Sequence, residues 1–451
     1  MAGKTYSKPG LRATTELDCL TMSLQTLVGD VRNYTSEQHA GFNEHPRRFW
    51  RTVSGMTIAP GTDNSLLSDA AAASPVYLDC NATTPIDPEV LAEVIHYLQE
   101  DFGNAGSRTH AYGQRAKERV NRAREQVAAP AGAKPDEVIF TSGATESNNL
   151  AILGLEQAGR DSGHMHIVTT QIEHKAVLEP IRELGRRGFE ITEVSPNSDG
   201  WVSADDISAA LRPDTHLVSV MAANNETGVF QPISDIAACL TSHGAFFHVD
   251  GAQAYGKVAD IFDNSRIDLI SLSGHKVYAP KGIGALIARR RGYERIPLSA
   301  LFVGGGQERG LRPGTLPVPL IAGLGTAIEL AGAKRLERKK YALQLREQAL
   351  TALAPLSILI NGDPSRALPH TLNFSVPGLD SEAALVALKG TAAISNGSAC
   401  TSQAYEPSHV LVAMDLGEDR INGALRLSWC HLTPRPDWLA IGSALERIRH
   451  R

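Results

Sequence analysis

From Val76 onward, short apolar runs alternate along the chain with longer amphipathic stretches. The apolar runs are rich in β-branched residues, whereas stretches such as residues 88–100 and 114–128 repeat apolar positions with a helical period. This alternation is typical of βαβ units. We therefore expect an α/β fold with a mainly parallel sheet flanked by helices.

The pattern changes after about residue 335. A charged helical stretch, residues 336–353, leads there into short strands between residues 358 and 374. The change predicts a large domain over residues 76–334 and a smaller α+β domain over residues 335–451. The first strand region, residues 76–85, is expected to belong to the large domain or to pack with the small one.

Residues 1–75 differ from the rest of the chain, because they mix polar residues with scattered arginines and end near a run of alanines. We expect a poorly ordered extension or an upstream mis-start. An organelle transit peptide is the alternative. Acidic residues such as Glu16, Asp18 and Asp30 disagree with the acid-poor composition of such peptides.

The composition of the whole chain is that of an ordinary globular protein. Its 451 residues are 42% hydrophobic and 21% charged, with a net charge of −5, which argues against a broad nucleic-acid-binding face. No apolar run reaches the length of a membrane span, and the N-terminus lacks the compact apolar region of a signal peptide. We expect a cytoplasmic protein with neither a membrane nor a stable nucleic-acid partner.

The five cysteines are scattered, without a CxxC pair or the spacing of zinc ligands. They are Cys19, Cys80, Cys239, Cys400 and Cys430. This pattern predicts neither a disulfide framework nor a metal site, and favours reduced thiols.

Polar residues follow five of the apolar runs, and ligands of an open parallel sheet bind beyond the carboxyl ends of its strands. Residues 141–147 form a glycine-containing turn into a helix N-terminus, which suits a phosphate group; a plain Ser or Thr cap is the alternative. His174 follows the next run, where its ring can stack on a flat cofactor or face solvent.

Three further strand ends carry candidate groups. Asn225 can bind a phenolic oxygen or hold a turn. Asp250 closes an apolar strand, so its carboxylate needs a cationic partner such as a protonated pyridine nitrogen or a structural ion pair. Lys276 brings an amine that can form a Schiff base. Together, the five strand ends supply the protein groups that pyridoxal phosphate chemistry requires.

Cys400 lies in a small, polar, glycine-containing segment, residues 395–403, which predicts a mobile loop with an accessible thiol rather than a mere surface turn. The thiolate needs a base or a nearby positive charge to form, and His174 can help. Its attack on the sulfur of bound cysteine would leave an enzyme persulfide and alanine. Arg426 can bind the substrate carboxylate with two hydrogen bonds, or form a surface salt bridge.

These motifs resemble the cysteine desulfurases of the NifS/IscS type, within the class V aminotransferases of pyridoxal phosphate (PLP) fold type I. The resemblance runs from Tyr77 to about Thr433 and includes residues 141–147, 273–276 and 397–402. It implies a seven-stranded sheet, pyridoxal 5'-phosphate and a homodimer. It also implies sulfur transfer from L-cysteine to an acceptor protein of iron–sulfur cluster assembly, tRNA thiolation or DNA phosphorothioation.

The resemblance further implies a role for each matching residue. The catalytic residues would be Lys276, which carries the Schiff base, Cys400, which carries the persulfide, and His174, which stacks on the ring. Asp250 would pair with the pyridine nitrogen and Gln253 with the phenolic oxygen. The other cofactor contacts would come from Ala144, Thr145, Asn225, Ser273, His275 and, across the dimer, Thr315. Substrate would be held by Asn104, Asn225 and Arg426.

Cys80 and residues 429–431 depart from the family pattern, whereas residues 397–402 resemble the long-loop group, whose loops can reach acceptor proteins. Two other functions are compatible with parts of the sequence. Another PLP-dependent β-lyase or aminotransferase of this fold would not need Cys400. A non-catalytic sulfur-assembly scaffold would not need the cofactor.

Overall fold

The computed structural model describes residues 74–396 and 407–449, which belong to one compact unit. Nearly all of the expected extension, residues 1–75, lies outside the described residues, so its disorder stays a prediction. Cys400 lies outside them as well. Within the described ranges, no helix is both long enough and apolar enough to cross a lipid bilayer.

A seven-stranded sheet forms the centre of the N-terminal part, in the order β2-β8-β7-β6-β5-β3-β4. Its strands are β2 (Val138–Thr141), β3 (His166–Thr170), β4 (Glu190–Val194), β5 (Thr215–Met221), β6 (Phe246–Asp250), β7 (Leu269–Ser273) and β8 (Gly284–Ala288). Neighbouring strands are parallel except where β8 pairs with β2 and β7. The prediction of a mainly parallel seven-stranded sheet is confirmed.

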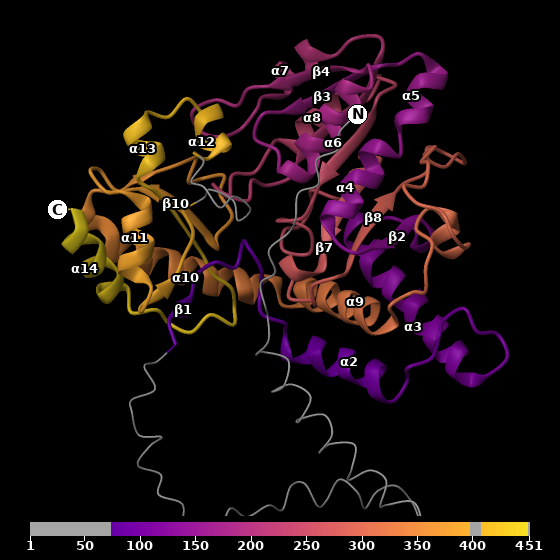
Figure 1. Cartoon of the computed structure of the whole chain (residues 1–451), viewed down its shortest axis with the longest axis horizontal. Helices are drawn as coiled ribbons and strands as arrows, with labels where there is room; N and C mark the ends of the chain where they lie inside the picture. Colours follow the sequence, from indigo (N-terminus) through magenta and orange to yellow (C-terminus); the bar gives the residue numbers. More distant parts are fainter. Residues whose placement is uncertain (1–73, 397–406, 450–451) are drawn as a thin grey trace, which may run out of the picture. The chain divides into compact units, whose positions relative to one another are not determined.

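Helices cover both faces of this sheet (Figure 1). One face carries α4 (Ala144–Leu153) and α6 (Lys175–Arg186), and α5 (Glu156–Ser162) follows α4. The other face carries α2 (Pro88–Gln99), α3 (Ala111–Ala128), α7 (Ala204–Ala210), α8 (Ile233–Cys239) and α9 (Val318–Ala333). Val138 and Phe140 accordingly point into one core cluster and Ile139 into the other. Helix α3 begins three residues before the predicted position, because His110 caps it by accepting a hydrogen bond from the Gly113 N–H.

The C-terminal part has its own core around a three-stranded antiparallel sheet, in the order β12-β10-β9. Its elements are α10 (Arg335–Leu353), β9 (Leu359–Ile360), β10 (Thr371–Ser375), α11 (Ser381–Leu388), β11 (Ala392–Ala393), α12 (His409–Ala413), α13 (Glu418–Asn422), β12 (Ala424–Ser428) and α14 (Trp438–Arg449). The first described strand, β1 (Val76–Tyr77), pairs with β11, and Leu78 lies in this core. The predicted domain boundary at residue 335 stays a prediction.

Five short 3-10 helices complete the described elements. They are η3 (Ala129–Ala131), η4 (Pro135–Glu137), η5 (Gly274–Lys276), η6 (Gln307–Gly310) and η7 (Ala354–Leu356). Among them, η5 follows β7 directly, and therefore carries Lys276 to the carboxyl end of the sheet.

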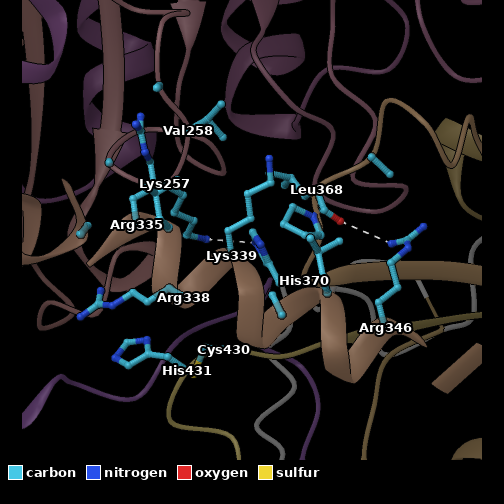
Figure 2. Close-up of a pocket in the computed structure, with 18 of the residues that line it drawn as sticks. Lys257, Val258, Arg335, Arg338, Lys339, Arg346, Leu368, His370, Cys430 and His431 are labelled. Atoms are coloured by element: carbon cyan, nitrogen blue, oxygen red, sulfur yellow. Dashed lines mark hydrogen bonds between the residues drawn. The ribbon is translucent and has the colours of Figure 1, made fainter. Parts of the chain in front are cut away.

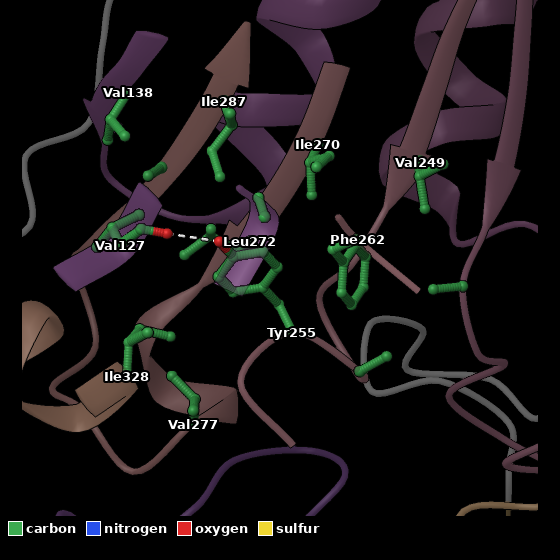
Figure 3. Close-up of a cluster of buried hydrophobic side chains, with 14 of the residues drawn as sticks. Val127, Val138, Val249, Tyr255, Phe262, Ile270, Leu272, Val277, Ile287 and Ile328 are labelled. Atoms are coloured by element: carbon green, nitrogen blue, oxygen red, sulfur yellow. Dashed lines mark hydrogen bonds between the residues drawn. The ribbon is translucent and has the colours of Figure 1, made fainter. Parts of the chain in front are cut away.

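Tyr255 joins the sheet to α3 inside the largest core cluster (Figure 3). Its ring packs against Phe262, with 5.0 Å between the ring centroids, and its hydroxyl donates a hydrogen bond to the Val127 carbonyl. The side chain is only 2% exposed. This hydrogen bond is therefore shielded from water, and its loss should cost stability.

We expect Tyr255→Phe to lower the free energy of unfolding by about 1 kcal/mol, because the Val127 carbonyl loses a buried donor. Urea unfolding followed by circular dichroism measures the change. Tyr293→Phe is the matched control, since Tyr293 is 99% exposed and should leave stability within about 0.5 kcal/mol. Equal effects of the two substitutions would contradict this account of the core.

Candidate active site

A cavity of about 540 Å³ lies at the carboxyl ends of the parallel strands. Ten predicted site residues line it, namely Ala144, Thr145, His174, Asn225, Asp250, Gln253, Ser273, His275, Lys276 and Arg426. Asn104 and Thr315 do not line it, and Cys400 lies outside the described residues. Most of the predicted site thus comes together in one cavity.

The turn between β2 and α4 supplies one end of this cavity. No side chain of the described residues caps α4, so the N–H groups at its start point to the cavity without a competing acceptor. A Cβ atom on Gly284 would lie 2.6 Å from the Gly143 Cα, so glycine at position 284 lets β8 pack directly beneath the turn. Such a turn with a positive dipole end suits an anionic group.

Asp250 ends β6 with its carboxylate buried against the cavity. One oxygen accepts a hydrogen bond from Asn148 Nδ2 at 2.8 Å, and the other accepts one from the Ala252 N–H at 2.8 Å. The residue is 5% exposed. Amide donors thus hold both oxygens and leave their remaining lone pairs for a ligand.

Sequence reasoning missed Asn148, although a signal existed. It lies one helical turn after Ala144 on α4, so the same helix that begins at the phosphate-binding turn also brings an amide to Asp250.

Lys276 places its amine at the same cavity. Its Nζ donates hydrogen bonds to the carbonyl oxygens of Asn81 and, at 2.8 Å, of Ala82. The Asn81 carbonyl also accepts a hydrogen bond from Gln253 Nε2 at 3.0 Å. Because Asn81 acts through its backbone oxygen, its residue type gave no sequence signal for this role.

Gln253 leaves its Oε1 atom buried and without a hydrogen-bond partner among the described residues. Since the amide nitrogen binds Asn81, the atom that faces the cavity is an acceptor. Contact with a phenolic oxygen, as the resemblance implies, would require the amide to turn around.

His174 ends the loop after β3 and caps α6. Its Nδ1 accepts a hydrogen bond from the Ala176 N–H at 3.0 Å, which leaves the proton of the neutral ring on Nε2. Burial lowers the pKa of His174, so the ring is neutral at pH 7. Burial and the charge of Lys276 similarly lower the pKa of His275 to about 4.

Arg426 lies on β12 and reaches the cavity from the C-terminal sheet. It is 5% exposed, so it is not the surface salt bridge that the sequence left open. Its Nη2 atom pairs with Asp79 at 2.6 Å, and its Nη1 atom donates to the Asn225 carbonyl at 3.0 Å. Its Nε atom is buried with no hydrogen-bond partner in the described part of the chain.

The two predicted residues outside the cavity lie on the surface. Asn104 is exposed in the loop after α2, where its side chain accepts a hydrogen bond from the Gly106 N–H at 2.8 Å. Thr315 is exposed just before α9. Neither residue can contact a ligand in the cavity of its own chain in this arrangement.

Comparisons with known proteins agree with this fold. The family model described as aminotransferase class-V matches residues 76–437. Cysteine desulfurase IscS of Vibrio cholerae is 46% identical over 378 residues, which are 83% of this chain and 92% of that protein.

Two solved structures are also similar. DndA from Streptomyces lividans has a TM-score of 0.69 and 50% identity, and the match covers 78% of this chain and 99% of that one. SspA in complex with cysteine has a TM-score of 0.70 and 37% identity, and the match covers 80% of this chain and 99% of that one.

The chain therefore belongs to the class-V aminotransferase family. Within that family, the prediction of a cysteine desulfurase of the NifS/IscS type is confirmed.

Glu173, which sequence reasoning also missed, is fully buried beside His174. Its Oε1 atom accepts hydrogen bonds from the Thr170 hydroxyl at 2.7 Å and the Met221 N–H at 2.9 Å. Its Oε2 atom has no partner among the described residues. Burial raises the pKa of Glu173 from 4.5 to about 8, so the carboxyl is protonated at neutral pH.

Between pH 4.5 and 8, Glu173 keeps its proton in the folded protein but releases it in the unfolded chain. The free energy of unfolding therefore falls as the pH rises through this range. Glu173→Gln mimics the neutral carboxyl and should remove this loss. From pH 5 to pH 7.5, the variant should gain about 3 kcal/mol relative to the unmodified protein. Urea unfolding at the two pH values measures the difference.

Glu183→Gln, on the exposed surface of α6, is the control. Hydrogen bonds from Arg187 and Arg186 lower the pKa of Glu183, so its effect lies below pH 4.5 and should not appear in this window. If Glu173→Gln left the pH dependence of the free energy of unfolding unchanged, this would disprove that the Glu173 carboxyl is neutral in the folded protein.

Proposed function

We propose that this cysteine desulfurase uses the cavity around Lys276 and Asp250 to bind pyridoxal 5'-phosphate and L-cysteine, and moves the substrate's sulfur onto Cys400. The observation that carries the proposal is that an amine, a buried carboxylate and an uncapped helix N-terminus line one cavity. Its volume of about 540 Å³ is ordinary for a cofactor site. The solved complex of SspA with cysteine supports L-cysteine as the substrate.

The residues at the cavity fit the cofactor group by group. The turn at Ala144 and Thr145, with Ser273 and His275, would hold the phosphate, and Asp250 would face the pyridine nitrogen. His174 would lie over the ring, and Lys276 would form the Schiff base. Bound pyridoxal phosphate supplies an electron sink next to the α-carbon of the amino acid.

The protein's own groups would orient the substrate and move protons. The Arg426 guanidinium, held by Asp79 and the Asn225 carbonyl, keeps a buried Nε–H without a partner among the described residues, which suits a carboxylate. Neutral His174 carries a proton on Nε2 and can donate it to a group in the cavity. When it is not bonded to the cofactor, the Lys276 amine could act as a base at the α-carbon of the bound substrate.

Access of Cys400 to the cavity is supported by the residues that flank its segment. Ser395 and His409 both line the cavity. Cys400 follows Ser395 by five positions in the sequence, which is enough chain to span about 17 Å. A thiol on this segment can therefore reach a substrate held by Arg426.

The sulfur transfer balances without a further oxidant. The Cys400 thiolate attacks the substrate sulfur, so an S–S bond forms while the bond between that sulfur and the β-carbon breaks. The β-carbon keeps the bonding electrons and gains a proton, which yields L-alanine. Cys400 is left as a persulfide, and its outer sulfur can be transferred to a second thiol.

We also propose a cytoplasmic homodimer in which Thr315 reaches the phosphate site of the partner subunit. Exposed apolar side chains in the segment that precedes Thr315 along the chain support this, namely Leu301, Phe302 and Val303. A second apolar stripe lies on α2 and the loop after it, made of Leu91, Ile95, Leu98 and Phe102. Such exposed apolar groups are typical of surfaces that another protein covers. The sulfur acceptor would be a scaffold or thiolation protein.

We expect Cys400→Ser to lower sulfide release from L-cysteine in the presence of dithiothreitol at least about hundredfold, because serine cannot form a persulfide. Methylene blue formation measures the sulfide, and amino-acid analysis measures the alanine. Cys239→Ser is the control. Cys239 is half-buried on α8, and this variant should keep full activity. Sulfide release that persists in Cys400→Ser would instead favour a β-lyase.

A further inference from the structure

A second cavity, of about 660 Å³, shares no lining residue with the active site. It lies between the segment after Gly256, helix α10 and residues 364–370. Five basic residues of the described part of the chain line it, namely Lys257, Arg335, Arg338, Lys339 and Arg346, but only one carboxylate of that part does, that of Asp260. The cavity therefore carries an excess of positive charge that no group of the known reaction requires.

Two of these five cations are already engaged by the protein. Arg346 donates hydrogen bonds to the carbonyl oxygens of Leu368 and Thr371. Arg338 pairs with Asp87 at 2.7 Å, although its Nε and Nη1 atoms are buried without a partner in the described ranges.

The other three cations, Lys257, Arg335 and Lys339, form no ion pair with a carboxylate of the described residues. Figure 2 shows Lys257 against the His370 ring, and Lys339 and Arg335 on α10 at the same cavity, with Arg335 one turn before Lys339. Clustered cations without counterions repel one another, and an anionic ligand would relieve that repulsion.

Lys257 is the most constrained of the three. Its Nζ atom lies 3.5 Å from His370 Nε2, and burial lowers the pKa of His370 well below its usual range, so this ring adds no charge. Burial lowers the pKa of Lys257 to about 8. The thiols of Cys80 and Cys430 also face Lys257, but a single thiolate there would offset only one charge of the cluster.

Apolar side chains such as Phe230, Val258, Leu336 and Leu343 form much of the remaining wall. A site with apolar walls and a few converging charges suits a ligand that has both a flat or apolar body and negative groups. Inorganic phosphate alone would leave these walls without contacts.

We propose that this second cavity binds a small organic phosphate with at least two negative charges, of the size of a nucleoside diphosphate. The phosphates would lie among Lys257, Arg335 and Lys339, with the organic body against the apolar walls. This site is independent of the proposed sulfur transfer, because neither its residues nor its charges take part in that reaction.

The test is calorimetric titration of the full-length, cofactor-loaded protein with adenosine 5'-diphosphate, pyrophosphate and adenosine. The loaded cofactor keeps these probes out of the active-site phosphate turn. We expect the diphosphate to bind most tightly, pyrophosphate more weakly and adenosine not at all. Arg335→Glu combined with Lys339→Glu should weaken diphosphate binding about tenfold or more, because both reversals lie inside the cavity.

Lys340→Glu combined with Lys389→Glu is the matched control, since both lysines are exposed, lie outside the cavity and change the net charge equally. It should leave the affinity within about twofold. No binding to the unmodified protein would overturn the proposal. Equal losses of affinity in the two double variants would also overturn it, since the attraction would then come from the overall charge. Binding of adenosine as tight as that of the diphosphate would overturn it as well.

Discussion

The chemistry of the active-site cavity depends on one buried negative charge, the carboxylate of Asp250. Withdrawing a carboxylate from water is costly unless hydrogen bonds and a cation compensate. Asn148 and the Ala252 N–H supply the hydrogen bonds. A protonated ring nitrogen in the cavity would supply the cation, which is why a carboxylate at this strand end favours a pyridine cofactor.

A single residue near the start of the described chain connects this site to the C-terminal sheet. The Asn81 N–H donates to Ser428 Oγ at 2.9 Å, and its side-chain amide donates to Thr371 Oγ1 at 3.0 Å. Its carbonyl oxygen accepts hydrogen bonds from both Lys276 and Gln253. The position of the Lys276 amine therefore depends on strands β10 and β12, far from it in the sequence.

Much of the site was predictable from the sequence, because its groups follow directly after apolar strands. His174, Asp250 and Lys276 each end or follow such a run, and the carboxyl ends of parallel strands share one edge of the sheet. Asn81, Asn148 and Glu173 were not predicted. Asn81 acts through a backbone oxygen, which every residue type carries, and the hydrogen bond from Asn148 joins residues 102 positions apart.

The sequence also could not separate contacts within one chain from contacts between chains. Asn104 and Thr315 belong to family motifs, yet both lie outside the cavity of their own chain. The order of the motifs along the chain identifies both residues as candidates. The packing of α2 and α9, however, decides which cavity Asn104 and Thr315 can reach. The second, cationic cavity was not predicted from the sequence either, because the lysine after Gly256 and the four basic residues of α10 meet only through the packing of separate segments.

The central claim is that Lys276, opposite Asp250, is the amine that holds the cofactor. Among the described residues, three lysines line the cavity, namely Lys175, Lys276 and Lys281. Reduction of the purified protein with borohydride, followed by peptide mass spectrometry, fixes any cofactor to the lysine that binds it. We expect the pyridoxyl mass on Lys276 alone. The same mass on Lys175 or Lys281, or no labelled lysine in the cofactor-loaded protein, would contradict the account.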